Sequence, residues 1–361
     1  MNCPTEREEY RLIILNNVPG HRRRYNPAMN FNVLILLLLQ ATVTSSATAV
    51  EPPVTAVVFA PNGESVIAAS QSGLRIYSWP DLQRRKTIEC EAANLHCVAF
   101  SPDGKHLTVG GGTPSEDGSV EFFSWPTCKR VSLHVEHVDS VQSIAWQSST
   151  SLLSAGIDRQ IKIFDFVPSG NRSKTTLNSP QPTGEENNPT FDGHSRSVSD
   201  LCLLDDRQTF VSAGVDQSLR VWDIESGQLV RSLNQHTGAV HDLALRPASE
   251  GLPMVASAAA DRTIRFWQPT IGRMVRYIRL EAEPLSIAWL DEDTLVAGCV
   301  DGRIRTIDAK NVKVTGDYAA ISRWAYAVAV HPNDGSVVVA GTGGQLRRIE
   351  LRGRRDSRTP R

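Results

Sequence analysis

A short strand-like phrase that ends in a bulky apolar residue returns along most of this 361-residue chain. Its seven copies are VTAVVF (54–59), LHCVAF (95–100), VQSIAW (141–146), VSDLCL (198–203), VHDLAL (240–245), PLSIAW (284–289) and AYAVAV (325–330). Their last residues lie 41, 46, 57, 42, 44 and 41 positions apart. Repeats of about 40–45 residues with four strands each are typical of propeller blades. The spacing therefore predicts an all-β fold, a seven-bladed β-propeller of four-stranded antiparallel blades.

Each phrase is followed by a turn and then by two further strand-like runs. The turn Ser101–Gly104 is typical, because Pro presets φ and Gly accepts the left-handed conformation that closes a hairpin. TFVSAG (209–214) is one of the second runs and LRVWD (219–223) is one of the third. A weaker fourth segment leads to the next phrase. Each recurring phrase is thus expected to be the first strand of its blade.

Three repeats share polar residues at constant offsets. The sets are His194, Ser212, Asp216 and Trp222; His236, Ser257, Asp261 and Trp267; and His137, Ser154 and Asp158, with Phe164 in place of the Trp. In every set the Ser lies four residues before the Asp. Together with Gly193-His194 and Trp222-Asp223, this pattern resembles the WD-repeat family over residues 54 to about 351. The resemblance implies that each set forms a buried, hydrogen-bonded chain inside its blade.

A Ser, a His and an Asp could also suggest the catalytic triad of a hydrolase, which is recognised by geometry and roles. Three copies at fixed repeat offsets are better explained as scaffolding that satisfies buried polar groups. We therefore predict no catalytic residues, and no enzyme. The main rival is a propeller enzyme or a cofactor-binding propeller of the cell envelope. That function would need polar side chains converging on the central channel, whereas the phrases supply mainly Val, Ile, Leu and Ala.

The N-terminal region carries a separate pattern. A basic stretch at 21–24 precedes an apolar run, FNVLILLLLQATV (31–43), and small residues follow through Ala47-Thr48-Ala49. These are the three parts of a secretory signal, and the run is shorter than the roughly 20 residues that span a bilayer. We expect an exported protein, periplasmic or extracellular, with no stable membrane span. A cytoplasmic or membrane-anchored scaffold is the alternative, and Met29 is an alternative to Met1 as the start.

The last blade needs a fourth strand, because only ten residues follow Leu351. Propellers of the resembled family commonly borrow this strand from the other end of the chain. The β-branched segment TVTSSATAV (42–50) precedes the first blade and suits that role. We predict that residues 43–50 close the seventh blade, with cleavage near Ala41 rather than Ala49. The expected domains are a signal-like extension (1–41), the propeller (42–351) and a basic tail (352–361).

Composition excludes several functions. The formal net charge is −1 with 21% charged residues, which gives no field for nucleic acid. The tail has five Arg and one Asp, and is either a solvated end or a basic tag for an acidic surface. The six cysteines form no C-x-x-C motif, and the acidic run at 291–293 lacks the spacing of a calcium loop. We predict no metal and no cofactor.

The resemblance also indicates where a partner would bind. Two positions in each blade are expected on one face of the ring: the residues just before the first strand and the residue before the turn Asp. The first set gives Asp139, Arg196, Glu283, Arg323 and Trp324, and the second gives Ile157, Val215, Ala260 and Val300. Apolar residues among charges, with Arg and Trp present, suit a protein or peptide partner. The alternative is that neighbouring residues half-bury the apolar four.

These observations predict an exported, monomeric WD-repeat-like propeller that acts as a non-enzymatic platform for a protein or peptide. The long insertion at 167–191, poor in apolar residues, is either a functional loop or a tolerated one. The partner, the start residue and any disulfide pairing stay open at this point.

Overall fold

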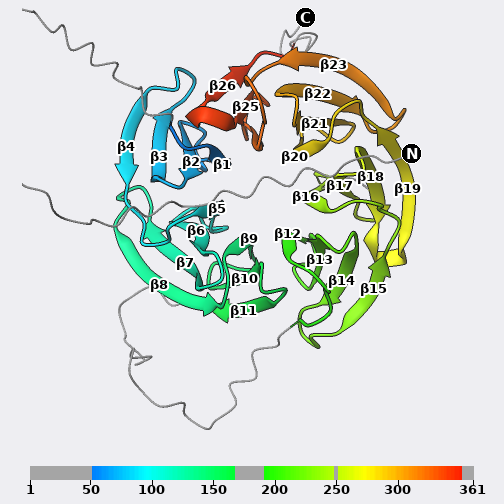
Figure 1. Cartoon of the computed structure of the whole chain (residues 1–361), viewed down its shortest axis with the longest axis horizontal. Helices are drawn as coiled ribbons and strands as arrows, with labels where there is room; N and C mark the ends of the chain where they lie inside the picture. The colour runs from blue at the N-terminus through cyan, green and yellow to red at the C-terminus, as the bar shows by residue number, and fades with distance from the viewer. Residues whose placement is uncertain (1–50, 167–190, 248–250, 352–361) are drawn as a thin grey trace, which may run out of the picture. The chain divides into compact units, whose positions relative to one another are not determined.

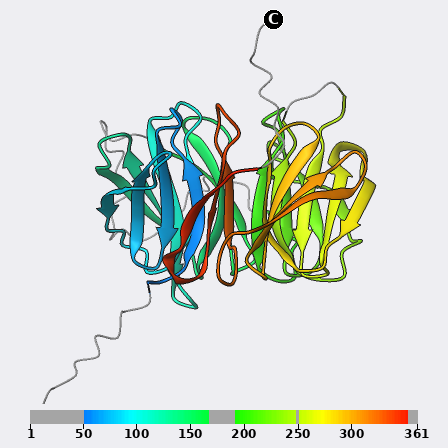
Figure 2. The same cartoon turned by 90° about the horizontal axis from the view of Figure 1, so that it is seen from above.

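A computed structural model describes residues 51–166, 191–247 and 251–351. Seven antiparallel sheets stand around a central axis, each with its first strand innermost (Figure 1). The predicted seven-bladed propeller is confirmed. Seen edge-on, the strands run between two faces on which the connecting loops gather (Figure 2).

The first three blades follow the chain from the inner strand outward. Blade 1 contains β1 (Val54–Phe59), β2 (Ser65–Ser70), β3 (Gly73–Ser78) and β4 (Arg84–Ile88). Blade 2 contains β5 (Leu95–Phe100), β6 (His106–Thr113), β7 (Asp117–Ser124) and β8 (Arg130–His137). Blade 3 contains β9 (Val141–Trp146), β10 (Ser151–Gly156) and β11 (Ile161–Asp165).

The other four blades repeat this order. Blade 4 contains β12 (Val198–Leu203), β13 (Thr209–Gly214), β14 (Leu219–Asp223) and β15 (Leu229–Leu233). Blade 5 contains β16 (Val240–Leu245), β17 (Val255–Ala259), β18 (Thr263–Gln268), the short helix η1 (Pro269–Ile271) and β19 (Arg273–Arg279). Blade 6 contains β20 (Pro284–Trp289), β21 (Thr294–Cys299), β22 (Arg303–Asp308) and β23 (Lys313–Ala319). Blade 7 contains β24 (Ala327–Val330), β25 (Val337–Ala340), η2 (Thr342–Gly344) and β26 (Leu346–Ile349).

Six inner strands coincide with the recurring sequence phrases, and β24 is two residues shorter than its phrase. At the start of that phrase, the Ala325 amide donates to the Cys299 carbonyl of blade 6 at 3.1 Å. Blades 3 and 7 have three strands each within the described residues. The predicted closing strand (43–50), the extension (1–41), most of the insertion (167–190) and the tail (352–361) lie outside them.

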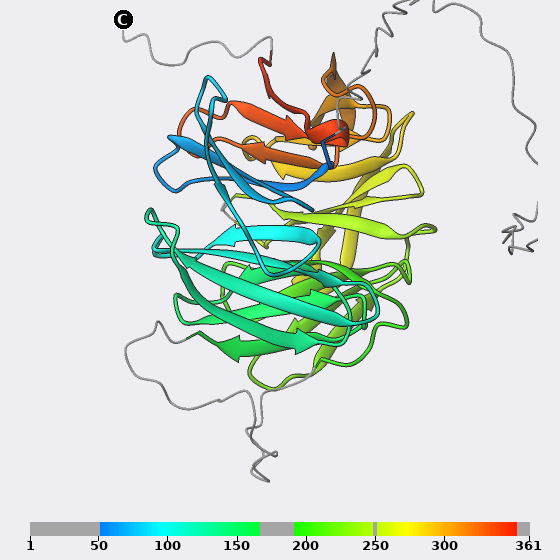
Figure 3. The ribbon, with the colours of Figure 1, turned by 60° about the vertical axis from the view of Figure 1, so that its left-hand side comes forward.

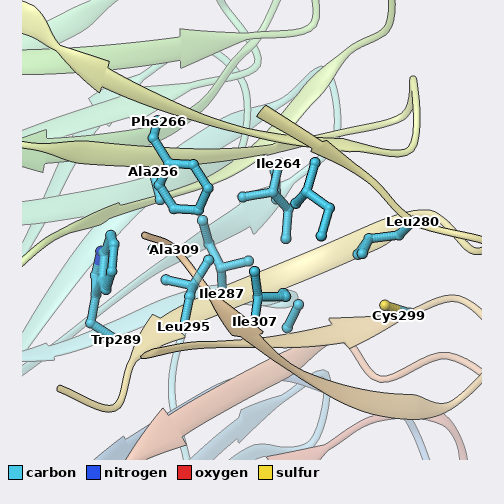
Figure 4. Packing of buried hydrophobic residues seen from close by; sticks show 13 residues of the cluster. Ala256, Ile264, Phe266, Leu280, Ile287, Trp289, Leu295, Cys299, Ile307 and Ala309 are labelled. Carbon is cyan, nitrogen blue, oxygen red and sulfur yellow. The ribbon is translucent and has the colours of Figure 1, made fainter. Parts of the chain in front are cut away.

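The core is a series of apolar layers between adjacent blades. Figure 4 shows one of them, where Ile264 and Phe266 of β18 face Ile287, Leu295 and Ile307 of blade 6. Each of these side chains is at most 4% exposed. Burying an apolar side chain of this size contributes about 1.5–3 kcal/mol, so each blade is stabilised mainly by its neighbours.

The ring closes where blade 7 meets blade 1, with β25 and β26 beside the first strands of the chain (Figure 3). The Val54 amide donates to the Gly341 carbonyl at 3.1 Å. On the same boundary His331 donates from Nε2 to the Gly63 carbonyl at 3.0 Å, and its ring stacks on Trp79. These contacts join segments from the two ends of the described propeller.

Candidate functional site

The polar set of blade 4 forms a continuous run of hydrogen bonds. Trp222 donates from Nε1 to the Ser212 hydroxyl at 2.8 Å, and that hydroxyl lies 2.7 Å from His194 Nε2. His194 Nδ1 lies 3.0 Å from the Asp216 carboxylate. The Ser218 hydroxyl adds a bond to Asp216 at 2.7 Å. The run ties the loop before β12 to the turn between β13 and β14.

Blade 5 repeats this geometry, and blade 3 repeats most of it. His236 lies 2.9 Å from Asp261 and 2.7 Å from Ser257, which accepts from Trp267 at 2.8 Å. In blade 3, His137 lies 2.9 Å from Asp158 and 2.7 Å from Ser154. Phe164 has no N–H to donate, so this run ends at the serine.

These sets hold the blades and are poorly placed for catalysis. Ser154, Ser212 and Ser257 are 0% exposed, so no substrate could reach their hydroxyls. Burial alone would raise the pKa of Asp216, but hydrogen bonds from His194 and Ser218 outweigh it and hold the pKa below its ordinary value. The pKa of Asp261 is lowered in the same way, because bonds from Thr263 and His236 outweigh the effect of burial. A carboxyl group with a lowered pKa stays charged at neutral pH and accepts hydrogen bonds.

In six blades a basic residue of the third strand pairs with the second-strand position that is Ser in blades 3 to 5. These basic residues are Arg75, Lys162, Arg220, Arg265, Arg305 and Arg347. In blade 6 the set of His, Ser and Trp is missing, and Arg305 holds the turn residue Asp301 through two nitrogens at 3.1 and 2.6 Å. Blade 2 has Glu121 instead, which is 0% exposed and accepts from the Ala92 amide at 2.8 Å.

The two sets of positions expected to bind a partner meet on one face, which we call the upper face. It consists of the segments before the inner strands and the turns between the second and third strands. The amides of Ile157, Val215, Ala260 and Val300 donate to the carbonyls of Ser140, Ser197, Ala239 and Glu283 at 2.8–3.0 Å. All four apolar residues are half-buried. In each of blades 3 to 6, a backbone bond therefore joins the end of the segment before the inner strand to the turn between the second and third strands.

The charged and aromatic members of the upper face differ in accessibility. Arg196, Arg323 and Trp324 are exposed, Trp324 to 51%. Asp139 is half-buried and accepts from the Ser115 and Ser140 amides at 3.0 and 2.8 Å. Glu283 pairs with His241 at 2.7 Å. Only the first three are therefore available to a partner without breaking internal bonds.

A cavity of about 290 Å³ lies on the ring axis and is lined by all seven inner strands. Its wall is more polar than the sequence predicted, since it includes Asp200, Asp242, His241 and Ser286. The recurring phrases place their second and third residues on the channel, and those positions are polar in most blades. The signal was present in the sequence, because VSDLCL and VHDLAL each carry an acid within an apolar phrase.

In the described parts of the chain, no group of three or more His, Cys, Asp or Glu side chains is placed to hold a metal ion. Over the same residues, no helix has the length and apolar character needed to cross a membrane. The five cysteines found there are free thiols: Cys90, Cys97, Cys128, Cys202 and Cys299.

Comparison with known proteins agrees with the geometry of the blades. The family model for the WD domain, G-beta repeat, matches residues 83–124, 128–165, 186–223 and 227–268. The chain is a WD-repeat β-propeller.

Similar proteins include Protein FIZZY-RELATED 2 of Arabidopsis thaliana, 27% identical over 76% of this chain and 54% of the relative. The B-type cell cycle switch protein ccs52A of Medicago truncatula is 26% identical over the same shares. The Anaphase-promoting complex subunit cdc20 of Dictyostelium discoideum is 26% identical over 62% of this chain and 42% of the relative. The chain spans about half the length of these relatives or less.

The prediction of an exported protein is wrong. The relatives are named for a cell cycle switch and for the anaphase-promoting complex, and the cell cycle is driven from inside the cell. The prediction rested on the composition of the N-terminal region, with its basic stretch, apolar run and small residues. A segment of that composition need not be a secretory signal.

Proposed function

We propose that the chain is a non-enzymatic protein-binding platform that works inside the cell, with the propeller (42–351) as its binding unit. The observation that carries the proposal is the exposed group Arg196, Arg323 and Trp324 on the upper face. Arg and Trp are among the residue types enriched at the energetic centres of protein interfaces. The WD-repeat relatives, which include a complex subunit, support a partner that is itself a protein.

The rigid frame beneath this group also supports binding rather than chemistry. The three buried polar runs and the backbone bonds of the upper face fix the loops before a partner arrives. A preorganised surface loses less conformational entropy on binding, which favours affinity.

The test is capture of partners from the native host by the full-length chain. Arg196→Ala with Trp324→Ala is expected to weaken capture while the far-UV circular dichroism stays unchanged. The matched control is Arg279→Ala with Tyr277→Ala, an exposed Arg and an aromatic residue, 54% exposed, on the outer strand β19. Equal capture by both double variants would place the binding surface elsewhere. Recovery of the full-length chain outside the cell would contradict the intracellular location.

A further inference from the structure

Side chains on the channel wall connect consecutive blades. At four junctions, the third residue of one recurring phrase accepts a hydrogen bond from the amide of the fourth residue in the next phrase. These contacts are Leu201 N to Ser143 Oγ (3.2 Å), Leu243 N to Asp200 Oδ2 (2.8 Å), Ile287 N to Asp242 Oδ2 (2.6 Å) and Val328 N to Ser286 Oγ (3.2 Å). The run extends from blade 3 to blade 7. Blades 1, 2 and 7 carry Ala56, Cys97 and Ala327 at the third position and cannot continue it with oxygen.

Two carboxyl groups meet in the middle of this run. The Leu243 amide lies 2.8 Å from an oxygen of Asp200 and 2.9 Å from an oxygen of Asp242. The other oxygen of Asp200 accepts from the Ser143 hydroxyl at 2.7 Å. Two carboxylates that share one amide repel each other strongly if both are charged, so such a pair holds a proton.

The surrounding groups offer no cation to relieve this repulsion. Neither Lys nor Arg is among the residues that line the cavity in the described chain. The other titratable groups that line the cavity are His96, Cys97, Tyr326 and His241, which faces Glu283. Burial raises the pKa of the Cys97 and Cys202 thiols, so these remain neutral.

We propose that Asp242 carries a proton at neutral pH and donates it to Asp200, and that this shared proton fastens blades 4, 5 and 6 at the channel wall. Asp242 also accepts from the Ile287 amide, so one protonated carboxyl touches all three blades. Loss of the proton sets two adjacent charges against each other and loosens the channel wall. The pair is thus a pH-sensitive clamp.

The direction of the pH dependence follows from the burial of the pair. Burial, and then the charge of Asp200, raise the pKa of Asp242 well above its ordinary value. Burial also raises the pKa of Asp200, while hydrogen bonds from Ser143 and Asp242 reduce that rise. A group with a raised pKa in the folded state adds stability that is complete at acid pH and is lost as the pH rises through that pKa.

The first experiment compares thermal unfolding of the full chain with that of Asp242→Asn from pH 6 upward. The Asn amide still donates to Asp200 but cannot ionise. We expect the Tm of the variant minus that of the wild type to increase by about 2 °C for each unit of rising pH. The increase should stop once the wild-type pair has ionised. The control is Asp81→Asn, an exposed carboxyl in a surface turn, whose Tm should run parallel to that of the wild type. A parallel Asp242→Asn curve would overturn the proposal.

A second measurement does not depend on how the variant folds. Infrared spectra of the wild-type chain at neutral pH should contain a band of a protonated carboxyl that disappears in alkali. Hydrogen exchange at the Leu243 and Ile287 amides should accelerate over the same pH range, beyond the intrinsic increase at control amides such as Val211 of β13. Absence of the band at neutral pH, or no excess exchange at these two amides, would contradict the shared proton.

Discussion

In blade 4, Asp216 accepts hydrogen bonds from His194 and Ser218, whereas in blade 6 the equivalent Asp301 is held by Arg305. Leu280, Ala297 and Ile307 of blade 6 stand where blade 4 has His194, Ser212 and Trp222. In both blades the Asp also caps the amide two residues later, Ser218 at 3.2 Å and Arg303 at 3.1 Å.

The turn between the second and third strands requires the Asp, whose carboxylate caps a backbone amide in both blades. The partner that neutralises the Asp varies, since a buried imidazole with a fixed hydrogen-bond chain and a guanidinium can both do so. Blade 7 has no such cap, because Gly343 occupies the Asp position. Its three described strands have four residues each.

The largest effect is expected from removing the proposed fourth strand of blade 7. Glu51 pairs with Arg75 at 2.7 Å. A side chain on Gly344 would meet the Glu51 carboxylate, so residue 51 lies near the start of β26. Deleting residues 43–50 should expose the β26 edge and lower the Tm more than any substitution below. Light scattering should also show association.

The control for this prediction is deletion of residues 2–9, which is equal in length. If both deletions leave the same Tm and the same monomeric protein, residues 43–50 do not close the ring.

The second prediction concerns the polar run of blade 4. Asp216→Ala should leave His194 without its acceptor and reduce the free energy of unfolding by about 1–3 kcal/mol. Urea unfolding measures this, with the exposed Asp205→Ala of the same blade as the control. Because the pKa of Asp216 is held low, its contribution is present at neutral pH and is lost as the pH falls through that pKa. The difference from the wild type should therefore narrow in acid, and an equal difference at all pH values would contradict the network.

The third prediction concerns the ion pair of blade 6. Asp301→Ala leaves the Arg305 side chain, only 5% exposed, without its main partner. We expect a loss of about 1 kcal/mol, smaller than in blade 4 because water reaches the partly exposed Asp301. Asp301→Ala with Arg305→Leu should recover part of this loss, since no buried charge remains unpaired. A double variant that is less stable than the single one would show that Arg305 stabilises the blade by other contacts.

The smallest effect is expected at the basic position of blade 4. Arg220 lies 3.8 Å from Asp216, which already has His194 as its partner. Arg220→Leu should change the free energy of unfolding by less than about 0.5 kcal/mol in the same urea experiment. A loss as large as that of Asp216→Ala would mean that the two blades use their arginines alike.

Much of this architecture could be predicted from the sequence, because its signals are periodic. The recurring apolar phrases and their turn residues predicted both ends of the inner strand correctly in six blades. Constant spacing placed His194, Ser212 and Asp216 in one set. The basic residue of the third strand was equally visible, in LRVWD and IRTID, but it needed the blade 6 geometry to show its role.

Other features depended on contacts between blades, which a one-dimensional pattern does not contain. Asp200 and Asp242 are 42 residues apart, and only the packing of blade 5 beside blade 4 makes them share the Leu243 amide. The bond from the Ala325 amide to the Cys299 carbonyl is another such contact, between blades 7 and 6. The cellular location depended on residues 1–50, where composition alone misled.

The hydrogen bonds along the channel wall join neighbouring blades, so the smallest part of this ring that keeps its own bonds is larger than one sequence repeat. Asp200 is encoded in one repeat, while the amide it needs, at Leu243, is encoded in the next. An engineer who transplants blade 4 by itself would carry the acceptor and leave its donor behind. Shuffled or lengthened versions of this propeller should therefore move neighbouring blades together, because a piece that contains blades 4 and 5 keeps both Asp200 and the Leu243 amide.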